Sequence, residues 1–373
     1  MKFINGKIFL KDRFVAGGIE FDERIRAAGS LVFGDSESID LKGAYVIPGL
    51  VDIHTHGAMG EDASDGKAEG LTIMAKYYAK EGVTSFLPTT MTLKEPELAR
   101  AMIAIKEFKR PSDGAKISGI HMEGPFVSYK KRGAQNADNL HAPDIAMFHR
   151  LNDLSGGLVK LITIAPEEEG AIPFIKEVSK ICAVSVGHTT ADYEISGKAF
   201  LNGADHATHL YNGMPGIHHR APAVIGAAFD HGAYAELIPD GFHIDPSVIR
   251  MTERLFGDHL VLISDSLRCA GMPDGDYMLG GQPITMKSGK AVLSGSDTLA
   301  GSSIHLMEGV RRAVAFGIPL ERAVYAASTA AARSVRMDEI GSLTVGSYAD
   351  LVILDEGLQV KAVYINGKEI NRS

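Results

Sequence analysis

The sequence predicts an α/β fold in which a (β/α)8 TIM barrel carries a small β-sandwich domain. Two observations indicate this architecture. Eight short apolar runs alternate with helical or loop segments through the middle of the 373-residue chain, and both ends of the chain consist of short β-favouring runs and turns. With 45% apolar residues, the chain can bury the large core that one barrel of roughly 250 residues requires.

The two ends of the chain read as strands of one small domain. The first 47 residues contain β-favouring runs separated by Asn-Gly, Lys-Asp, Gly-Gly and Gly-Asp breaks: Phe3-Ile4, Lys7–Leu10, Phe14-Val15, Ile19–Phe21, Ile25-Arg26 and Leu31–Phe33. Near the other end, Leu351–Leu354 and Val360–Ile365 precede Asn366-Gly367, a strong hairpin signal. We therefore expect residues 1–47 and 336–373 to fold together, with residues 48–335 inserted between them as the barrel.

The middle of the chain alternates strand and helix. Its apolar runs of strand length are residues 51–56, 84–88, 117–122, 159–165, 183–187, 206–211, 235–239 and 260–264. Helical spacing relates Leu98, Met102, Ile105 and Phe108, and Asp245-Pro246 pairs a cap residue with a proline suited to the first helical position. An open doubly wound sheet is the alternative, but no Gly-rich phosphate motif follows the first run to support it.

The first central run ends in two histidines, His54 and His56, directly before Gly57. Residues two apart in a strand project to the same face, so both imidazoles can reach one point at its C-terminal end. This geometry suits a divalent metal. Taken alone, the pattern is equally typical of histidines that pack in a core or lie on a surface.

Other central runs also end in titratable side chains. Glu123, His188 and Asp265 each directly follow such a run, and His209 lies within the run 206–211. In a barrel the active site lies at the C-terminal ends of the strands, so these groups would meet at one mouth. Core packing does not require this convergence, although each group could be a separately satisfied polar residue.

The residue types suit hydrolysis at a metal centre. Four imidazoles and one carboxylate, without clustered thiols, fit Zn²⁺, Fe²⁺, Mn²⁺ or Co²⁺, and Glu123 could bridge two ions. Asp265 could take a proton from an activated water molecule and pass it to the leaving group. It could instead orient a ligand or bind the metal itself.

Composition excludes several other classes of protein. The net charge of −8 and the pI near 6.0 argue against a nucleic-acid-binding protein. Two cysteines, Cys182 and Cys269, favour buried thiols in a reducing compartment over a disulfide framework. No signal peptide and no apolar stretch of membrane-spanning length is evident, so we expect a cytoplasmic protein with no membrane partner.

Several motifs together resemble the N-acetylglucosamine-6-phosphate deacetylase family of the amidohydrolase superfamily. They occur in the family's order: His54-Thr55-His56-Gly57, His121–Phe126, Gly187-His188-Thr189, His209–Met214, His218-His219-Arg220, Asp240–His243, Ser264-Asp265 and Gly341–Leu351. The resemblance covers nearly the whole chain from Tyr45 onward. It implies hydrolysis of the acetamide of an N-acetylhexosamine 6-phosphate to acetate and the amino sugar phosphate, by a homodimer.

The resemblance also implies roles for individual residues. The principal metal ligands would be Glu123, His188 and His209, with His54 and His56 at a second position, so that each subunit holds one or two divalent ions. Asp265 matches the catalytic acid/base. The sugar phosphate would be contacted by Gln135, Asn212, Gly213, Arg220 and His243, and one charged contact could come from a neighbouring subunit. His218 and His219 are candidate neighbours of the phosphate or simply hydrogen-bond their loop, and Arg220 could instead form a surface salt bridge.

Some positions depart from the family pattern. Gln135 stands where some relatives carry histidine, Gly213 and Ser266 stand where alanine is common, and Ala221 and Ala223 replace glutamate and glycine. None of these changes removes a proposed ligand, but they leave the choice between the gluco and galacto sugars open. A dihydroorotase-type enzyme would carry a lysine at the end of the fourth strand, where this chain has Ala165-Pro166-Glu167. A noncatalytic scaffold would have lost a ligand or Asp265.

Overall fold

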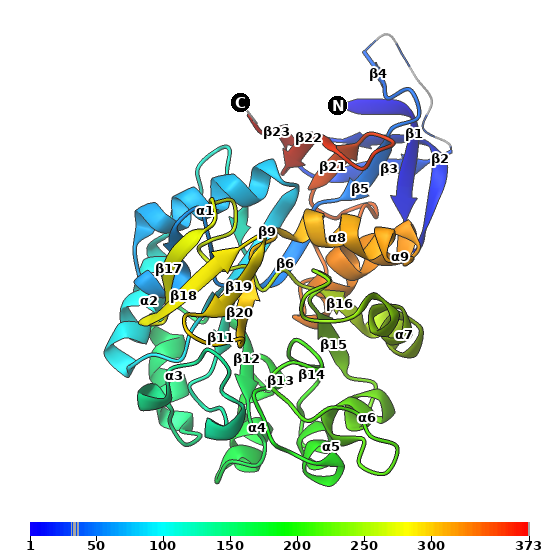
Figure 1. Cartoon of the computed structure of the whole chain (residues 1–373). Coiled ribbons are helices and arrows are strands. Elements are labelled where there is room, and N and C mark those ends of the chain that lie inside the picture. The colour runs from blue at the N-terminus through cyan, green and yellow to red at the C-terminus, as the bar shows by residue number, and fades with distance from the viewer. Residues whose placement is uncertain (31, 33–34, 36, 372–373) are drawn as a thin grey trace.

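The computed structural model describes residues 1–30, 32, 35 and 37–371 (Figure 1). Its central sheet has eight parallel barrel strands: β6 (Leu50–Thr55), β9 (Val83–Thr90), β11 (Ile120–Glu123), β12 (Val159–Ile164), β13 (Ala183–Val186), β14 (His206–Ala207), β15 (Tyr234–Leu237) and β16 (Leu260–Leu262). They are hydrogen-bonded in that order. A parallel bridge between Thr55 and Ser266 links the two ends of the order. The predicted barrel is confirmed.

Helices surround these strands in Figure 1. They are α1 (Ala68–Lys80), α2 (Glu95–Glu107), α3 (Ile145–Leu154), α4 (Ala171–Val178), α5 (Tyr193–Leu201), α6 (Ala223–Asp230), α7 (Pro246–Phe256), α8 (Leu306–Ala315), α9 (Leu320–Tyr325) and α10 (Ala331–Ser334). Helix α2 buries Leu98, Met102 and Ile105 as predicted, but it ends at Glu107, so Phe108 lies just past it. Helix α7 begins at Pro246, and the Asp245 side chain accepts a hydrogen bond from the Ser247 N–H, as the cap signal indicated.

Several strands end one or two residues before their apolar runs, and two runs differ more strongly from the strands that they form. The run 117–122 is divided at Ser118-Gly119 into β10 (Lys116–Ile117) and β11, and both parts pair with β9. The run 206–211 forms a strand over only two residues, because the backbone turns into left-handed conformations at His209 and Tyr211. The shorter strand places His209 in the loop at the barrel mouth.

Both ends of the chain join one small sheet. Its order is β23-β22-β21-β5-β1-β2-β3, with β4 also paired to β1. The bounds are β1 (Lys2–Leu10), β2 (Arg13–Phe21), β3 (Ile25–Gly29), β4 (Ile39–Asp40), β5 (Tyr45–Pro48), β21 (Leu351–Leu354), β22 (Val360–Ile365) and β23 (Lys368–Glu369). Asn366-Gly367 connects β22 to its antiparallel partner β23, as its hairpin signal predicted. The division at residues 47/48 and 335/336 stays a prediction.

Two predicted breaks near the N-terminus are wrong. Strand β1 runs through Asn5-Gly6, where the register with β2 shifts and Asn5 adopts a φ of 57°, so the dipeptide forms a bulge within the ladder. Strand β2 likewise runs through Gly17-Gly18. Of the expected run at 31–33, Leu31 and Phe33 lie outside the described residues.

A four-stranded antiparallel sheet between β16 and α8 was not predicted. It consists of β17 (Gly275–Leu279), β18 (Gln282–Lys287), β19 (Lys290–Leu293) and β20 (Leu299–Ser302), drawn in yellow in Figure 1. Gly280-Gly281 and Ser288-Gly289 form its first two turns and are the signals that could have revealed it. A further small ribbon pairs β7 (Gly57–Ala58) with β8 (Glu61–Asp62).

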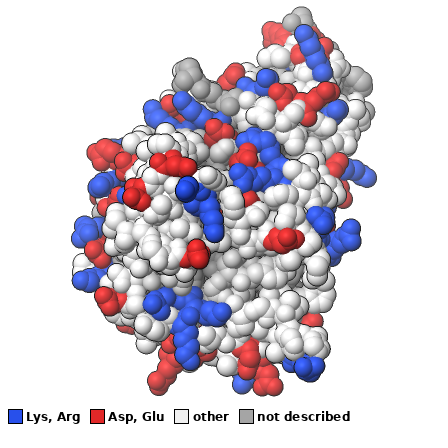
Figure 2. Space-filling view, in the orientation of Figure 1, with Lys and Arg blue, Asp and Glu red and all other residues white. Residues whose placement is uncertain are grey.

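The surface carries charges of both signs. Figure 2 shows Lys and Arg interspersed with Asp and Glu over the face that it draws, around a central hollow lined mainly by other residue types. None of the helices in the described residues is both long enough and apolar enough to span a membrane.

Candidate active site

Three of the predicted site residues have strained backbones. His188, His209 and Asp265 follow β13, β14 and β16, and their φ angles are 47°, 29° and 48°. Residues with a side chain rarely adopt this left-handed region, and such strain often occurs at functional sites. Here the sharp turn at each strand end keeps these three side chains buried at the mouth.

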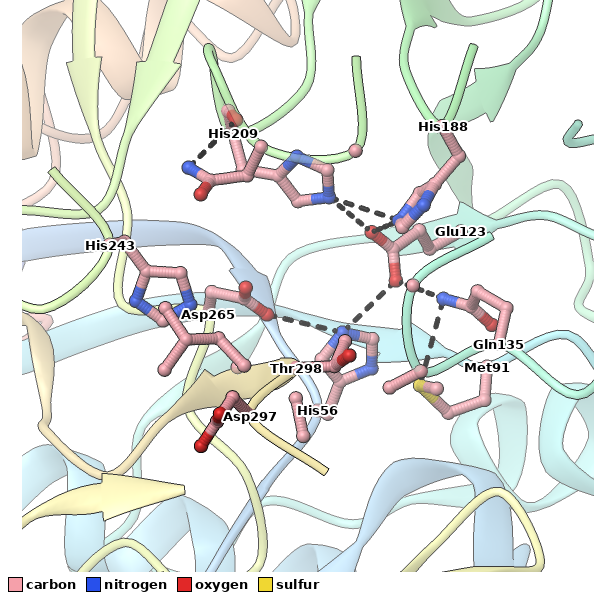
Figure 3. Close-up of a pocket in the computed structure, with 17 residues that line it drawn as sticks. His56, Met91, Glu123, Gln135, His188, His209, His243, Asp265, Asp297 and Thr298 are labelled. Carbon is pink, nitrogen blue, oxygen red and sulfur yellow. Dashed lines mark hydrogen bonds and ion pairs between the residues drawn. The ribbon is translucent and has the colours of Figure 1, made fainter. Parts of the chain in front are cut away.

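The carboxylate of Glu123 brings two imidazoles together. Its Oε1 lies 3.1 Å from His188 Nε2 and 3.0 Å from His209 Nε2, and these two nitrogens are 3.1 Å apart (Figure 3). Two ring nitrogens that face each other need a proton or a cation between them. The ligand atoms of a tetrahedral Zn²⁺ with bonds of about 2.0–2.1 Å lie roughly 3.3 Å apart, so this spacing fits a metal.

A second group of ligands adjoins the first. His54 Nε2 lies 3.4 Å from Glu123 Oε1, and His56 Nε2 lies 3.3 Å from Glu123 Oε2. Asp265 Oδ1 lies 3.4 Å from His56 Nε2 and 3.6 Å from His54 Nε2. Oε1 of Glu123 therefore faces His54, His188 and His209, and Oε2 faces His56. The carboxylate lies between the two histidine pairs, as expected of a group between two cation positions.

The outer nitrogens of two imidazoles are already occupied. The Nδ1 of His188 donates to the backbone oxygen of Lys131 (2.8 Å), and the Nδ1 of His54 donates to Glu236 (2.9 Å). In each ring the Nε2 then faces the cluster, as a metal-binding histidine requires. Within the described chain, His54 Nε2 has no hydrogen-bond partner although it is fully buried. These residues fit a divalent cation.

Charge in the cluster is strongly coupled. Burial raises the pKa of Glu123, but the neighbouring imidazoles of His54 and His188 outweigh it and hold that pKa well below its usual range. Burial likewise opposes ionisation of Asp265, and His54 and His56 outweigh it, so its pKa is also lowered. Both acids are therefore carboxylates at neutral pH, ready to bind a cation or accept a proton.

A cavity of about 300 Å³ opens above this cluster. His56, Glu123, His188, His209 and Asp265 line it, and His54 lies behind them. Of the predicted substrate contacts, the structure brings four to the cavity and leaves one outside. Gln135, Asn212, Gly213 and His243 line it, whereas Arg220 is exposed and bonds His219 Nε2 through its Nη1 (2.7 Å).

The comparison with known proteins decides the family. The amidohydrolase family profile matches residues 45–370. The chain belongs to the amidohydrolase family. The N-acetylglucosamine-6-phosphate deacetylase of Bacillus subtilis (strain 168) is 39% identical over 326 residues, which cover 85% of this chain and 82% of the relative. The N-acetylgalactosamine-6-phosphate deacetylase of Escherichia coli O157:H7 is 36% identical, with 86% of each chain covered.

A solved structure extends this amidohydrolase likeness to the whole chain. N-acetyl-D-glucosamine-6-phosphate deacetylase from Mycobacterium smegmatis, in complex with N-acetyl-D-glucosamine-6-phosphate, matches 99% of both chains with a TM-score of 0.94 and 30% identity. The family resemblance expected from the motifs is thereby confirmed, and this amidohydrolase stands among the N-acetylglucosamine-6-phosphate deacetylases.

The amidohydrolase site also contains residues that the sequence analysis missed. The carboxylate of Glu236, on β15, contacts His54 from inside the barrel. Asp297 and Thr298, on the loop between β19 and β20, line the cavity. An acidic residue inside the apolar run 235–239 was a signal for Glu236, whereas the loop could not be placed without its sheet.

Gln135 is held from both ends of its amide. Its Nε2 donates to Glu123 Oε2 (2.6 Å), and its Oε1 accepts from the backbone N–H of Thr92 (2.7 Å). The Thr92 N–H can only donate, so it selects the amide orientation in which nitrogen faces the Glu123 carboxylate. Gln135 therefore supports Glu123 in addition to lining the cavity.

Proposed function

We propose that this amidohydrolase hydrolyses the acetamide of N-acetylglucosamine 6-phosphate to glucosamine 6-phosphate and acetate. The observation that carries the proposal is the convergence of Glu123, His188 and His209 within 3.1 Å of one another, with Asp265 beside them, in the cavity of a chain related to deacetylases of that name. The cation would be Zn²⁺, Fe²⁺, Mn²⁺ or Co²⁺, one or two per subunit.

The chemistry divides between the cation and the chain. A divalent cation held by Glu123, His188 and His209, with His54 and His56 at a second position, would lower the pKa of a water molecule to about 7 and polarise the acetyl oxygen. Asp265 takes the proton of the attacking water. It returns that proton to the sugar nitrogen as the C–N bond breaks, because an amine anion is a poor leaving group.

The substrate contacts are proposed for the cavity residues and Arg220. His243 donates through Nδ1 to Asp240 (2.7 Å), which leaves its Nε2 for the phosphorylated sugar. Asn212 uses its amide nitrogen on the backbone oxygens of His209 and Leu210, so its side-chain oxygen can meet a sugar hydroxyl, and Gly213 adds its backbone. Arg220, exposed beyond the cavity, would reach the phosphate of a neighbouring subunit in a homodimer. A cytoplasmic location is also proposed, because Cys182 and Cys269 are both buried free thiols, as in proteins of a reducing compartment.

The deciding assay measures acetate released from N-acetylglucosamine 6-phosphate by the purified full-length chain. Galactosamine and unphosphorylated counterparts form the panel, since one relative is a galactosamine-type deacetylase. Release that stops with a chelator and returns with a divalent metal supports the proposal. Metal-loaded protein that releases no acetate from either sugar phosphate would contradict it.

A further inference from the structure

A fully buried carboxylate lies beneath the cation cluster. Glu236 projects from β15 into the barrel, and none of its surface is exposed. Its Oε2 accepts a hydrogen bond from His54 Nδ1 (2.9 Å) and another from the backbone N–H of His209 (3.3 Å). One oxygen atom thus contacts a residue from each of the two histidine pairs.

Packing does not explain this side chain. A buried carboxylate is unfavourable unless it is paired, and within the described chain Glu236 Oε1 has no hydrogen-bond partner. An apolar residue would fill the interior of the strand without that penalty. The two hydrogen bonds that Oε2 accepts indicate what this carboxylate does.

We infer that Glu236 is a positioning residue that makes His54 a metal ligand. The Glu236 carboxylate can only accept, so His54 carries its hydrogen on Nδ1 and turns Nε2 toward Glu123 and Asp265. A carboxylate behind a metal-binding imidazole also raises its basicity as a ligand. This inference depends on the cation site proposed above, but not on the identity of the substrate.

Among the described residues, no side chain other than Glu236 accepts a hydrogen bond from the His54 ring. The ring of His121 lies 4.5 Å from that of His54, but its Nε2 bonds the Thr163 hydroxyl (2.8 Å) and it makes no hydrogen bond to His54. Asp52, the nearby buried carboxylate, accepts from backbone N–H groups of His54 and Ser264 instead of from the ring. Asp52→Asn is therefore a matched control, because it neutralises a carboxylate in the same interior without touching an imidazole.

The test measures metal affinity and not turnover. The full-length chain is stripped with a chelator and titrated with Zn²⁺ alone, and bound zinc is counted by mass spectrometry. We expect Glu236→Leu to lower the affinity for one Zn²⁺ ion by about 10- to 100-fold. This should be the same ion whose binding His54→Ala weakens. Glu236→Gln should fall between wild type and Glu236→Leu, because an amide oxygen can still accept from Nδ1. In a His54→Ala background, Glu236→Leu should not weaken the binding of that ion any further.

Two results would overturn the inference. One is unchanged Zn²⁺ affinity in both Glu236 variants. The other is a loss of Zn²⁺ affinity as large as that of Glu236→Leu, either in Asp52→Asn or when Glu236→Leu is added to His54→Ala. Such a loss would indicate a general effect of the barrel interior. If Glu236→Leu does not fold, the isosteric Glu236→Gln in the same cycle still decides. Zinc affinities that follow the expected pattern in a chain that releases no acetate would sustain this inference while the proposed reaction fails.

Discussion

The Nε2 atoms of His188 and His209 lie 3.1 Å apart, and both face the same oxygen of Glu123. The rings cross nearly at right angles, at 88°, with centroids 4.7 Å apart. Because His188 Nδ1 donates to a backbone oxygen, its Nε2 is free to act as a lone-pair donor. Shared coordination of one cation would account for this contact of like atoms.

Removal of that cation should abolish activity and lower stability. Dialysis against a chelator is expected to reduce acetate release at least about 100-fold, with recovery on adding a divalent metal. Metal at about 100 times its dissociation constant should stabilise the fold by roughly 2.7 kcal/mol, seen as a higher Tm. His209→Ala should lose both responses and the exposed His231→Ala should keep them. A chelated chain with full activity would exclude the metal-dependent reaction.

Asp265→Asn should separate catalysis from metal binding. The amide cannot take the proton of water, so kcat is expected to fall about 10²- to 10⁴-fold while the metal content stays near that of wild type. Asp297 provides the matched control, because its carboxylate lines the same cavity without joining the cluster of histidines. Rates and metal content are measured on both variants. Normal turnover in Asp265→Asn would remove it from the proposed role.

Arg220→Ala tests the proposed phosphate contact. A guanidinium binds phosphate through two parallel hydrogen bonds, so its loss should raise KM for the phosphorylated sugar about 10-fold or more and leave the weak reaction of the unphosphorylated sugar unchanged. Arg26→Ala, at an exposed position in β3 of the small sheet, is the control. KM equal to that of wild type for both sugars would show that Arg220 belongs to the surface alone.

His305 should make stability depend on pH. Burial, together with the charge of Arg311, lowers the pKa of His305 to about 4, although Glu81 lies 3.3 Å from its Nε2. The neutral ring caps α8, because its Nδ1 accepts from the Glu308 N–H. Between pH 6.5 and about pH 4, His305 is protonated in the unfolded chain but stays neutral in the folded chain. The free energy of unfolding therefore falls as the pH drops through this range, and it levels off below about pH 4.

The pH effect can be isolated with His305→Asn, which keeps a capping side chain but does not titrate. The shift corresponds to roughly 3 kcal/mol between pH 7 and pH 4. Urea unfolding of both proteins across this range should show wild type losing that much more stability than the variant. Parallel curves for the two proteins would mean that His305 titrates normally in the fold.

Much of the site could be predicted because parallel strands end at one face. An apolar run leads to each of these site residues: His54, Glu123, His188, His209 and Asp265. A barrel brings the C-terminal ends of such runs together. By contrast, the contacts of Glu236 and Gln135 join residues from different strands and loops. Their direction depends on which atom each side chain turns inward, and no periodicity of the sequence encodes that choice.

The order of apolar runs and turns by itself determined a barrel, a small sheet built from both ends of the chain, and a set of metal-binding residue types. Only the tertiary structure decided that β1 continues through Asn5-Gly6, that the sheet β17–β20 contributes residues to the cavity, and that Arg220 lies outside it. The physical reason is that local patterns determine which side chains can be buried. Their partners depend on chain segments far apart in sequence, which become neighbours only when the barrel closes.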